Sequence, residues 1–186
     1  MEKIDDTAAK ALCAVNAGIV ALCESPLQLL NIIEYSLRHN CGGTVLIRLN
    51  GNKVNEDQFK EVLKHNRYLQ PKFFSLAKKE YSVTKYLMLL TNYINDLWSS
   101  EYVVIGDARV PWIKLLSLAS RKKRLVIVDD GDYTLNLAAQ SKTCVDTFWY
   151  RRFINISLFT SFNLANTRFD VVENDYSEIR RHSTGV

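Results

Sequence analysis

The sequence predicts an α/β protein built on a doubly wound, parallel, Rossmann-like sheet. Short apolar runs alternate along the chain with longer segments in which apolar residues recur every three or four positions. Parallel strands need a crossover, which is usually a helix, so this alternation favours a parallel sheet. Two of the runs, 101–105 and 124–128, also end in acidic residues, and ligands of such sheets bind outside the carboxyl ends of the strands. With 186 residues, 47% of them apolar, we expect one domain over 1–186.

The first strand and helix have the clearest patterns. Residues 18–23 form an uninterrupted apolar run, which indicates a buried strand. Ser25 and Pro26 then predict the start of a helix, with serine as the N-cap and proline at the first helical position. Glu34 and Arg38 lie four positions apart on this helix and are placed to pair across one turn.

The later elements follow the same logic. The Gly42-Gly43 pair predicts a turn before the second strand, and Asn55, followed by two acidic residues, predicts the cap of the second helix. The basic stretch 121–124 lies where the fourth helix ends, and cations there complement the helix dipole. In order, the predicted elements are a helix from Ser25 to about Asn40, strand 44–49, helix 55–69, strand 72–77, helix 83–99, strand 101–105, helix 111–122 and strand 124–128.

Beyond Gly131 the pattern is weaker. A short helix is expected over 133–140 and a sixth strand over 169–172, while 147–162 is rich in aromatic side chains. Aromatic and basic side chains suit a membrane surface, so peripheral contact with a membrane is one interpretation of that stretch. Packing in the core or against another domain is the favoured one.

Composition and charge exclude several classes of protein. A net charge of +4 from 24 basic and 20 acidic residues is too mild for nucleic-acid binding, which needs a concentrated basic face. The four cysteines are scattered without a C-x-x-C pair, and the three histidines form no ligand-like pair, so neither a disulfide nor a metal site is expected. The apolar stretch 17–23 is too short to cross a bilayer, and no signal peptide is visible. We therefore expect a cytoplasmic protein.

Asp129 and Asp130 end the strand 124–128. Neighbouring residues of a strand point to opposite faces, so we expect only one of these side chains to face a cleft. A carboxylate there can act as a general base on a hydroxyl nucleophile, and burial or an acidic neighbour would tune its pKa for that role. The alternative is a turn with Gly131, in which the aspartates accept hydrogen bonds from backbone amides.

Four further side chains lie at a predicted strand end or helix start. Asp107 and Arg109 follow strand 101–105, where the planar guanidinium can hold a carboxylate or phosphate; the alternative is a salt bridge to one of the aspartates. Ser25 and Gln28 begin the first helix, whose free amides favour an anionic group. Capping alone would explain Ser25, and a solvated position would explain Gln28. No G-x-G-x-x-G or Walker-type loop follows a strand, so no nucleotide cofactor is expected.

Four short motifs, taken together, carry a resemblance to a known family. They are Cys23-Glu24-Ser25-Pro26-Leu27-Gln28-Leu29-Leu30-Asn31, Ile105-Gly106-Asp107-Ala108-Arg109, Val128-Asp129-Asp130-Gly131 and Phe159-Thr160-Ser161-Phe162. These motifs resemble bacterial sialyltransferases, in particular the lipooligosaccharide sialyltransferase and capsular polysialyltransferase groups. The resemblance covers most of the chain.

The resemblance implies one half of a GT-B glycosyltransferase, an enzyme of two Rossmann-like domains that face each other across a cleft. Such an enzyme transfers sialic acid from CMP-sialic acid to a glycan acceptor with inversion and without a metal. By position, Asp129 is the first residue of the family's acidic-acidic-glycine motif and would deprotonate the acceptor hydroxyl. Asp130 and Gly131 would shape the turn at the strand end.

The chain departs from the family in one motif. The family's His-Pro dipeptide helps to bind the CMP phosphate, and none of the three histidines here precedes a proline. We therefore expect an N-terminal, acceptor-side half that needs a second domain for CMP-sialic acid and serves capsule or lipooligosaccharide synthesis in the cytoplasm or at the inner membrane. The competing hypothesis is a non-catalytic Rossmann-like binding or interaction module.

Overall fold

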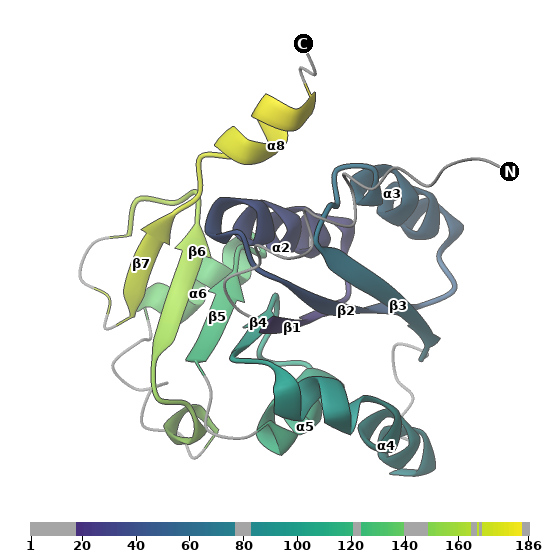
Figure 1. Ribbon diagram of the computed structural model, residues 1–186. Helices are drawn as coiled ribbons and strands as arrows, with labels where there is room; N and C mark the ends of the chain where they lie inside the picture. The colour runs from purple at the N-terminus through teal and green to yellow at the C-terminus, as the bar shows by residue number, and fades with distance from the viewer. Residues whose placement is uncertain are drawn as a thin grey trace, which may run out of the picture.

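The protein is a doubly wound α/β structure with one seven-stranded, all-parallel sheet (Figure 1). The computed structural model describes residues 18–76, 83–120, 124–139, 149–164, 167 and 169–183. The strands follow the order β3-β2-β1-β4-β5-β6-β7 across the sheet. This arrangement confirms the predicted fold class.

The elements alternate along the chain as the sequence predicts. The strands are β1 (Gly18–Cys23), β2 (Gly42–Leu49), β3 (Leu69–Ser75), β4 (Tyr102–Ile105), β5 (Arg124–Val128), β6 (Ile156–Thr160) and β7 (Asp170–Glu173). The helices are α2 (Pro26–His39), α3 (Lys53–Leu63), α4 (Val83–Ser99), α5 (Pro111–Ala119), α6 (Asp132–Ala139) and α8 (Ser177–Ser183), with a short 3₁₀ turn η2 (Tyr150–Arg152). No helix in these described ranges is long and apolar enough to cross a membrane.

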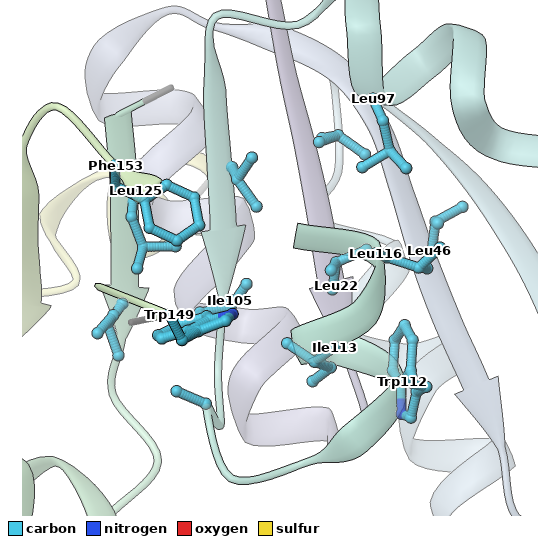
Figure 2. Close-up of a cluster of buried hydrophobic side chains, with 14 of the residues drawn as sticks. Leu22, Leu46, Leu97, Ile105, Trp112, Ile113, Leu116, Leu125, Trp149 and Phe153 are labelled. Atoms are coloured by element: carbon cyan, nitrogen blue, oxygen red, sulfur yellow. The ribbon is translucent and has the colours of Figure 1, made fainter. Parts of the chain in front are cut away.

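Two apolar layers sandwich the sheet. On one face, α2, α3 and α8 pack through side chains such as Ile32, Phe59 and Ile179 against strand residues including Val104 and Val126. On the other face, helices α4, α5 and α6 cover the opposite strand residues, and Figure 2 shows this second cluster. Its labelled members are Leu22, Leu46, Leu97, Ile105, Trp112, Ile113, Leu116, Leu125, Trp149 and Phe153. Helices on both faces explain why the central strands are apolar throughout.

The direction of strand addition reverses between β1 and β4. From β1 the chain adds β2 and β3 on one side, then returns to add β4 to β7 on the other side. Ligands of such sheets bind in the crevice outside the carboxyl ends of the strands at this reversal. Glu24 follows β1 and Gly106 follows β4, so the residues after these two strands lie where a functional site is expected.

Several predicted boundaries are wrong. β3 begins at Leu69, three residues before the predicted start at 72, and two further differences have a local reason. Gly42 and Gly43 belong to β2 rather than to a turn, because β2 passes so close to β1 that a Cβ atom at Gly43 would overlap the backbone of Ile19. The cap of α3 is Asn52 rather than Asn55: its Oδ1 atom accepts from the amides of the second and third residues that follow it, at 3.0 and 3.4 Å. The helix therefore begins and ends earlier than predicted.

The sequence prediction misses β6, which lies within the aromatic-rich stretch. Of that stretch, residues 149–162 are described, and Trp149, Phe153 and Phe159 are buried in the core. Core packing is therefore the correct interpretation for this part. The predicted sixth strand is present as β7, one residue later along the chain.

The predicted pairing of Glu34 with Arg38 is also wrong. Glu34 is fully buried, and its two carboxylate oxygens accept from the amides of Glu178 and Ile179 at 2.9 and 2.7 Å. Arg38 instead lies 3.2 Å from the carboxylate of Asp175. Both side chains of α2 therefore hold the segment around the start of α8.

Candidate functional site

Polar side chains at the carboxyl ends of the strands form two clusters that meet at the end of β5. One surrounds the side chain of Asp129 and draws on β6 and the segment before α8. The other surrounds the side chain of Asp130 and draws on the ends of β1 and β4 and the start of α2. The two consecutive aspartates thus serve different parts of the same edge.

The carboxylate of Asp129 is held rigidly through one of its two oxygens. The residue is 3% exposed, and its Oδ2 atom accepts from the hydroxyls of Thr160 and Ser161, both at 3.0 Å, and from the amide of Ser161 at 3.2 Å. These three donors are all neutral. Its Oδ1 atom is buried and has no hydrogen-bond partner among the described residues. Nearly all buried polar atoms in native proteins have a partner, so this oxygen calls for an explanation.

Tyr176 lies beside this carboxylate with an unusual backbone. Its φ angle of 54° is in the left-handed region, which bulky side chains rarely adopt. Its amide donates to the side chain of Asn174 at 3.1 Å. Asn174 in turn donates to Asn31 at 2.8 Å, and Asn31 donates to the backbone carbonyl of Asp129 at 3.0 Å. Burial raises the pKa of Tyr176, while hydrogen bonds with Asn31 and Ser161 lower it in part.

The turn after β5 fixes the directions of both aspartates. Gly131 has a φ angle of 62°, a conformation that glycine adopts without strain. The amide of Asp130 donates to the hydroxyl of Thr134 at 3.0 Å, and the amide of Thr134 donates to the carbonyl of Gly131 at 3.0 Å. The predicted strand-end turn is therefore present. The backbone amide that reaches the Asp129 side chain, however, comes from the end of β6 and not from the turn itself.

Asp130 lies on the other side of this turn and is partly buried. Burial is the largest cause that raises the pKa of its carboxyl group, and Asp107 raises it further. A hydrogen bond with Gln28 and the nearby Arg109 lower it in part. Asp129 and Asp130 therefore have different partners, and the opposite directions expected from strand alternation stay a prediction.

Gln28 fills the crevice between the carboxyl ends of β1 and β4. It is 3% exposed, and its Oε1 atom accepts from the amide of Glu24 at 2.8 Å. A Cβ atom at Gly106 would overlap the Gln28 side chain, so the two residues are fitted to each other. The interpretation of Gln28 as a solvated residue is therefore wrong. Ser25 caps α2 as predicted, accepting from the amide of Gln28 at 3.2 Å.

Arg109 forms a salt bridge with Asp107, which is one of the two alternatives that the sequence allows. Its Nη2 atom lies 2.8 Å from Oδ2 of Asp107, and its Nε atom lies 3.0 and 3.1 Å from the two carboxylate oxygens. Asp107 also accepts from the amide of Arg109 at 2.7 Å, which closes the turn after β4. The Arg109 side chain is 67% exposed, so this pair lies at the rim of the crevice.

An ion pair between buried Arg48 and partly buried Glu24 lies next to the crevice and is absent from the sequence prediction. Glu24 pairs with Arg48, whose Nε atom also donates to the carbonyl of Leu76 at 2.9 Å. The indole of Trp112 donates to Glu24 at 2.6 Å. The sequence does contain a signal for this pair, because Arg48 is a charged residue inside the apolar strand run 44–49. A charge at such a position needs a partner.

A cavity of about 300 Å³ opens beside the Asp129 cluster, at the ends of β6 and β7. Its walls are Ser161, Phe162, Asn163, Leu164, Val171 and Glu173. Ser161 is shared, because it lines the cavity and also donates to Asp129. Thr160 and Ser161 belong to one of the four sequence motifs but have no predicted role there, and no sequence pattern points to Tyr176 or Asn174.

The structure brings together six of the seven predicted site residues around the turn and the crevice, with Asp129 apart from the others. The group at the crevice and turn is Ser25, Gln28, Asp107, Arg109, Asp130 and Gly131. Among the described residues, no three His, Cys, Asp or Glu side chains are grouped so that they could hold a metal ion. The comparisons do not identify a family, because neither a protein-family model nor a curated protein sequence matches the chain.

Proposed function

We propose that this chain is the acceptor-side domain of a sialyltransferase-like glycosyltransferase, with Asp129 as the base that finally holds the proton of the acceptor hydroxyl. In this proposal a second domain, in the same polypeptide or another, binds CMP-sialic acid. The resemblance of the four motifs supports the family, and one structural observation supports the role of Asp129. That observation is a buried carboxylate with Oδ2 fixed by three donors and Oδ1 without a partner among the described residues.

A general base must be held in one orientation and must have an oxygen that can take up a proton. Thr160 and Ser161 fix the orientation of Asp129 through hydrogen bonds to one oxygen. A buried polar atom without a partner is unfavourable for folding, so its presence at a strand end is typical of a functional position. Both features fit a base better than a structural turn residue.

The reaction is a displacement at the anomeric carbon of the sialic acid. The acceptor oxygen forms a bond to that carbon as the bond from the carbon to the CMP phosphate oxygen breaks. The electron pair of the broken bond leaves with CMP, and the proton of the acceptor hydroxyl is transferred to Asp129. A positioned general base of this kind contributes about 100- to 10,000-fold to such a rate.

Binding measurements on the chain test this proposal. We expect calorimetry to detect acceptor glycans and to show much weaker binding of CMP, because the donor site is placed on another domain. The matched control is bovine serum albumin at the same concentration, which reports non-specific heats. Tight binding of CMP with no binding of any glycan would contradict the proposal.

The second candidate is a non-catalytic binding or interaction module. One observation favours it: Asp129 is 3% exposed, so no substrate reaches its carboxylate directly in this conformation. Under this alternative, the Asp129 cluster only joins β5 and β6 to the segment before α8. The same calorimetry discriminates, because a structural cluster predicts no glycan binding.

A further inference from the structure

We infer that the acceptor sugar binds in the cavity at the ends of β6 and β7, and that Ser161 relays the proton from its hydroxyl group to Asp129. This inference rests on the proposed function and specifies where its acceptor lies. It assigns Ser161 as a group that touches the substrate, and it places Asp129 one hydrogen bond further from the reaction.

Asp129 and Ser161 differ in how accessible they are to a ligand in the cavity. The Oδ1 atom of Asp129 is buried, and the residue is only 3% exposed. Ser161 is exposed and lines the cavity, while its hydroxyl lies 3.0 Å from Oδ2 of Asp129. A hydroxyl group of a sugar in the cavity can therefore reach Ser161 without any movement of the protein. Ser161 therefore links the cavity to the carboxylate.

The walls of the cavity suit a sugar. Phe162, Leu164 and Val171 supply apolar surface on which the C–H face of a sugar ring can pack, and Asn163 and Glu173 supply hydrogen-bonding groups for its hydroxyls. The volume of about 300 Å³ lies at the lower end of the range of ligand sites, about 300 to 1,000 Å³, so one sugar ring fits better than a long glycan segment. Glu173 is the charged residue among these six walls and repels an anionic sugar. The expected occupant is an uncharged terminal sugar.

The hydrogen bonds of Ser161 leave room for the relay. Its amide and its hydroxyl both donate to Oδ2 of Asp129. A serine hydroxyl has two acceptor lone pairs, and a hydrogen bond with Tyr176 engages this group on one side. A lone pair that Tyr176 does not occupy is free to accept from the sugar. Ser161 can then donate to Asp129 and accept from the substrate at the same time.

The relay conserves protons and electrons. The acceptor hydroxyl transfers its proton to the oxygen of Ser161 as Ser161 transfers its own proton to Oδ2 of Asp129. The acceptor oxygen forms the new bond to the anomeric carbon of a CMP-activated sugar, and CMP leaves with the electron pair of the broken bond. Ser161 ends as a neutral hydroxyl, and Asp129 ends protonated.

Amide NMR of the chain, titrated with lactose as an uncharged probe, locates the binding site. We expect shifts at residues 161–164, 171 and 173, and we expect Phe162→Ala to lower the affinity at least fivefold while the spectrum remains that of a folded protein. Leu115→Ala, a substitution at an exposed apolar residue of α5, is the matched control and should leave the affinity unchanged. Shifts confined to Gln28, Gly106 and Arg109 would overturn the cavity assignment and leave the acceptor-domain proposal standing. No binding of lactose or of any longer glycan would overturn the proposed function together with this inference.

The relay itself predicts which of two substitutions, Ser161→Ala or Asp129→Asn, lowers the affinity for lactose more. Ser161→Ala should lower lactose affinity about 3- to 10-fold, the loss of one hydrogen bond, and Ser161→Thr should restore most of it because threonine keeps the hydroxyl. Asp129→Asn should lower the affinity less than Ser161→Ala does, because the carboxylate does not touch the sugar. A larger loss for Asp129→Asn in a variant with an unchanged melting temperature would show direct contact and overturn the relay. Full affinity in Ser161→Ala would overturn it as well.

Discussion

Ser161 donates to Asp129 twice, from its hydroxyl at 3.0 Å and from its amide at 3.2 Å, and both hydrogen bonds end on the same carboxylate oxygen. The two residues directly follow neighbouring strands, since β5 and β6 pair in parallel and end at Val128 and Thr160. Their contact therefore extends the sheet pairing beyond the last ladder hydrogen bonds. It also fixes the carboxylate oxygen, Oδ2, to which the relay inferred above delivers its proton.

The first prediction concerns transfer activity. In an assay that supplies a CMP-sialic-acid-binding domain in trans, Asp129→Asn should lower the rate of sialyl transfer about 100- to 10,000-fold, because an amide cannot act as the base. Asp57→Asn is the matched control, since Asp57 is an exposed residue that pairs with Lys60 on α3. Radiolabelled product formation measures both. Wild-type transfer by Asp129→Asn would remove Asp129 from the mechanism.

The second prediction tests the fit between Gly106 and Gln28. Gly106→Ala should destabilise the protein by about 1–3 kcal/mol, because the new methyl group overlaps the buried Gln28 side chain. Urea unfolding measures the loss. In a Gln28→Ala background, where the overlapping atoms are gone, the same substitution should cost clearly less. An equal cost in both backgrounds would show that the overlap is not the cause.

The third prediction tests the carboxylate that holds α8. Glu34→Gln should destabilise the protein by about 1–3 kcal/mol, because one of the amides of Glu178 and Ile179 loses its acceptor on this buried side chain. Glu61→Gln, at an exposed residue of α3, should change stability by less than about 0.5 kcal/mol. Hydrogen exchange gives a second readout, since the two amides should exchange faster in Glu34→Gln. Unchanged exchange would contradict the capping role.

The fourth prediction concerns pH and Asp130. The pKa of its carboxyl group in the folded protein is raised above the usual value of 3.8, chiefly by burial. The native state therefore keeps this proton at pH values where the unfolded chain has lost it, so stability falls as pH rises from about 3.8 through the folded pKa. Asp130→Asn should remove this decline and be the more stable protein at neutral pH. Urea unfolding between pH 4 and pH 7 checks it, and a difference of opposite sign would contradict the burial argument.

Local patterns predict the elements whose residues determine their own structure. Strand 124–128 and helix 83–99 are predicted with the observed bounds, because an apolar run and a regular three-to-four spacing are complete within each segment. The cap of α3 is different: Asn52 and Asn55 are both good caps, and local sequence does not choose between them. β6 is missed because its five residues lie inside the longer aromatic-rich stretch 147–162, and nothing in their own pattern separates them from it.

In the candidate site, too, some features follow from local sequence and others depend on the folded sheet. Strand alternation predicts that Asp129 and Asp130 point apart, and the cap at Ser25 follows from its neighbours in sequence. The partners of Asp129 do not follow from local sequence, since they depend on which strand lies next to β5. That neighbour, β6, comes after a long connection in the chain, so only the folded sheet brings Ser161 to the carboxylate.

The side chain of Glu34 meets amides that are 144 and 145 positions later in the chain. During synthesis, α2 therefore leaves the ribosome long before the partners of its buried carboxylate exist. Until then the buried carboxylate of Glu34 lacks these two donors. Contacts of such long range slow folding, so we expect the nascent chain to become compact in one late step, after α8 has emerged. Arrest of translation before residue 178 should accordingly give a nascent chain that proteases cut within α2.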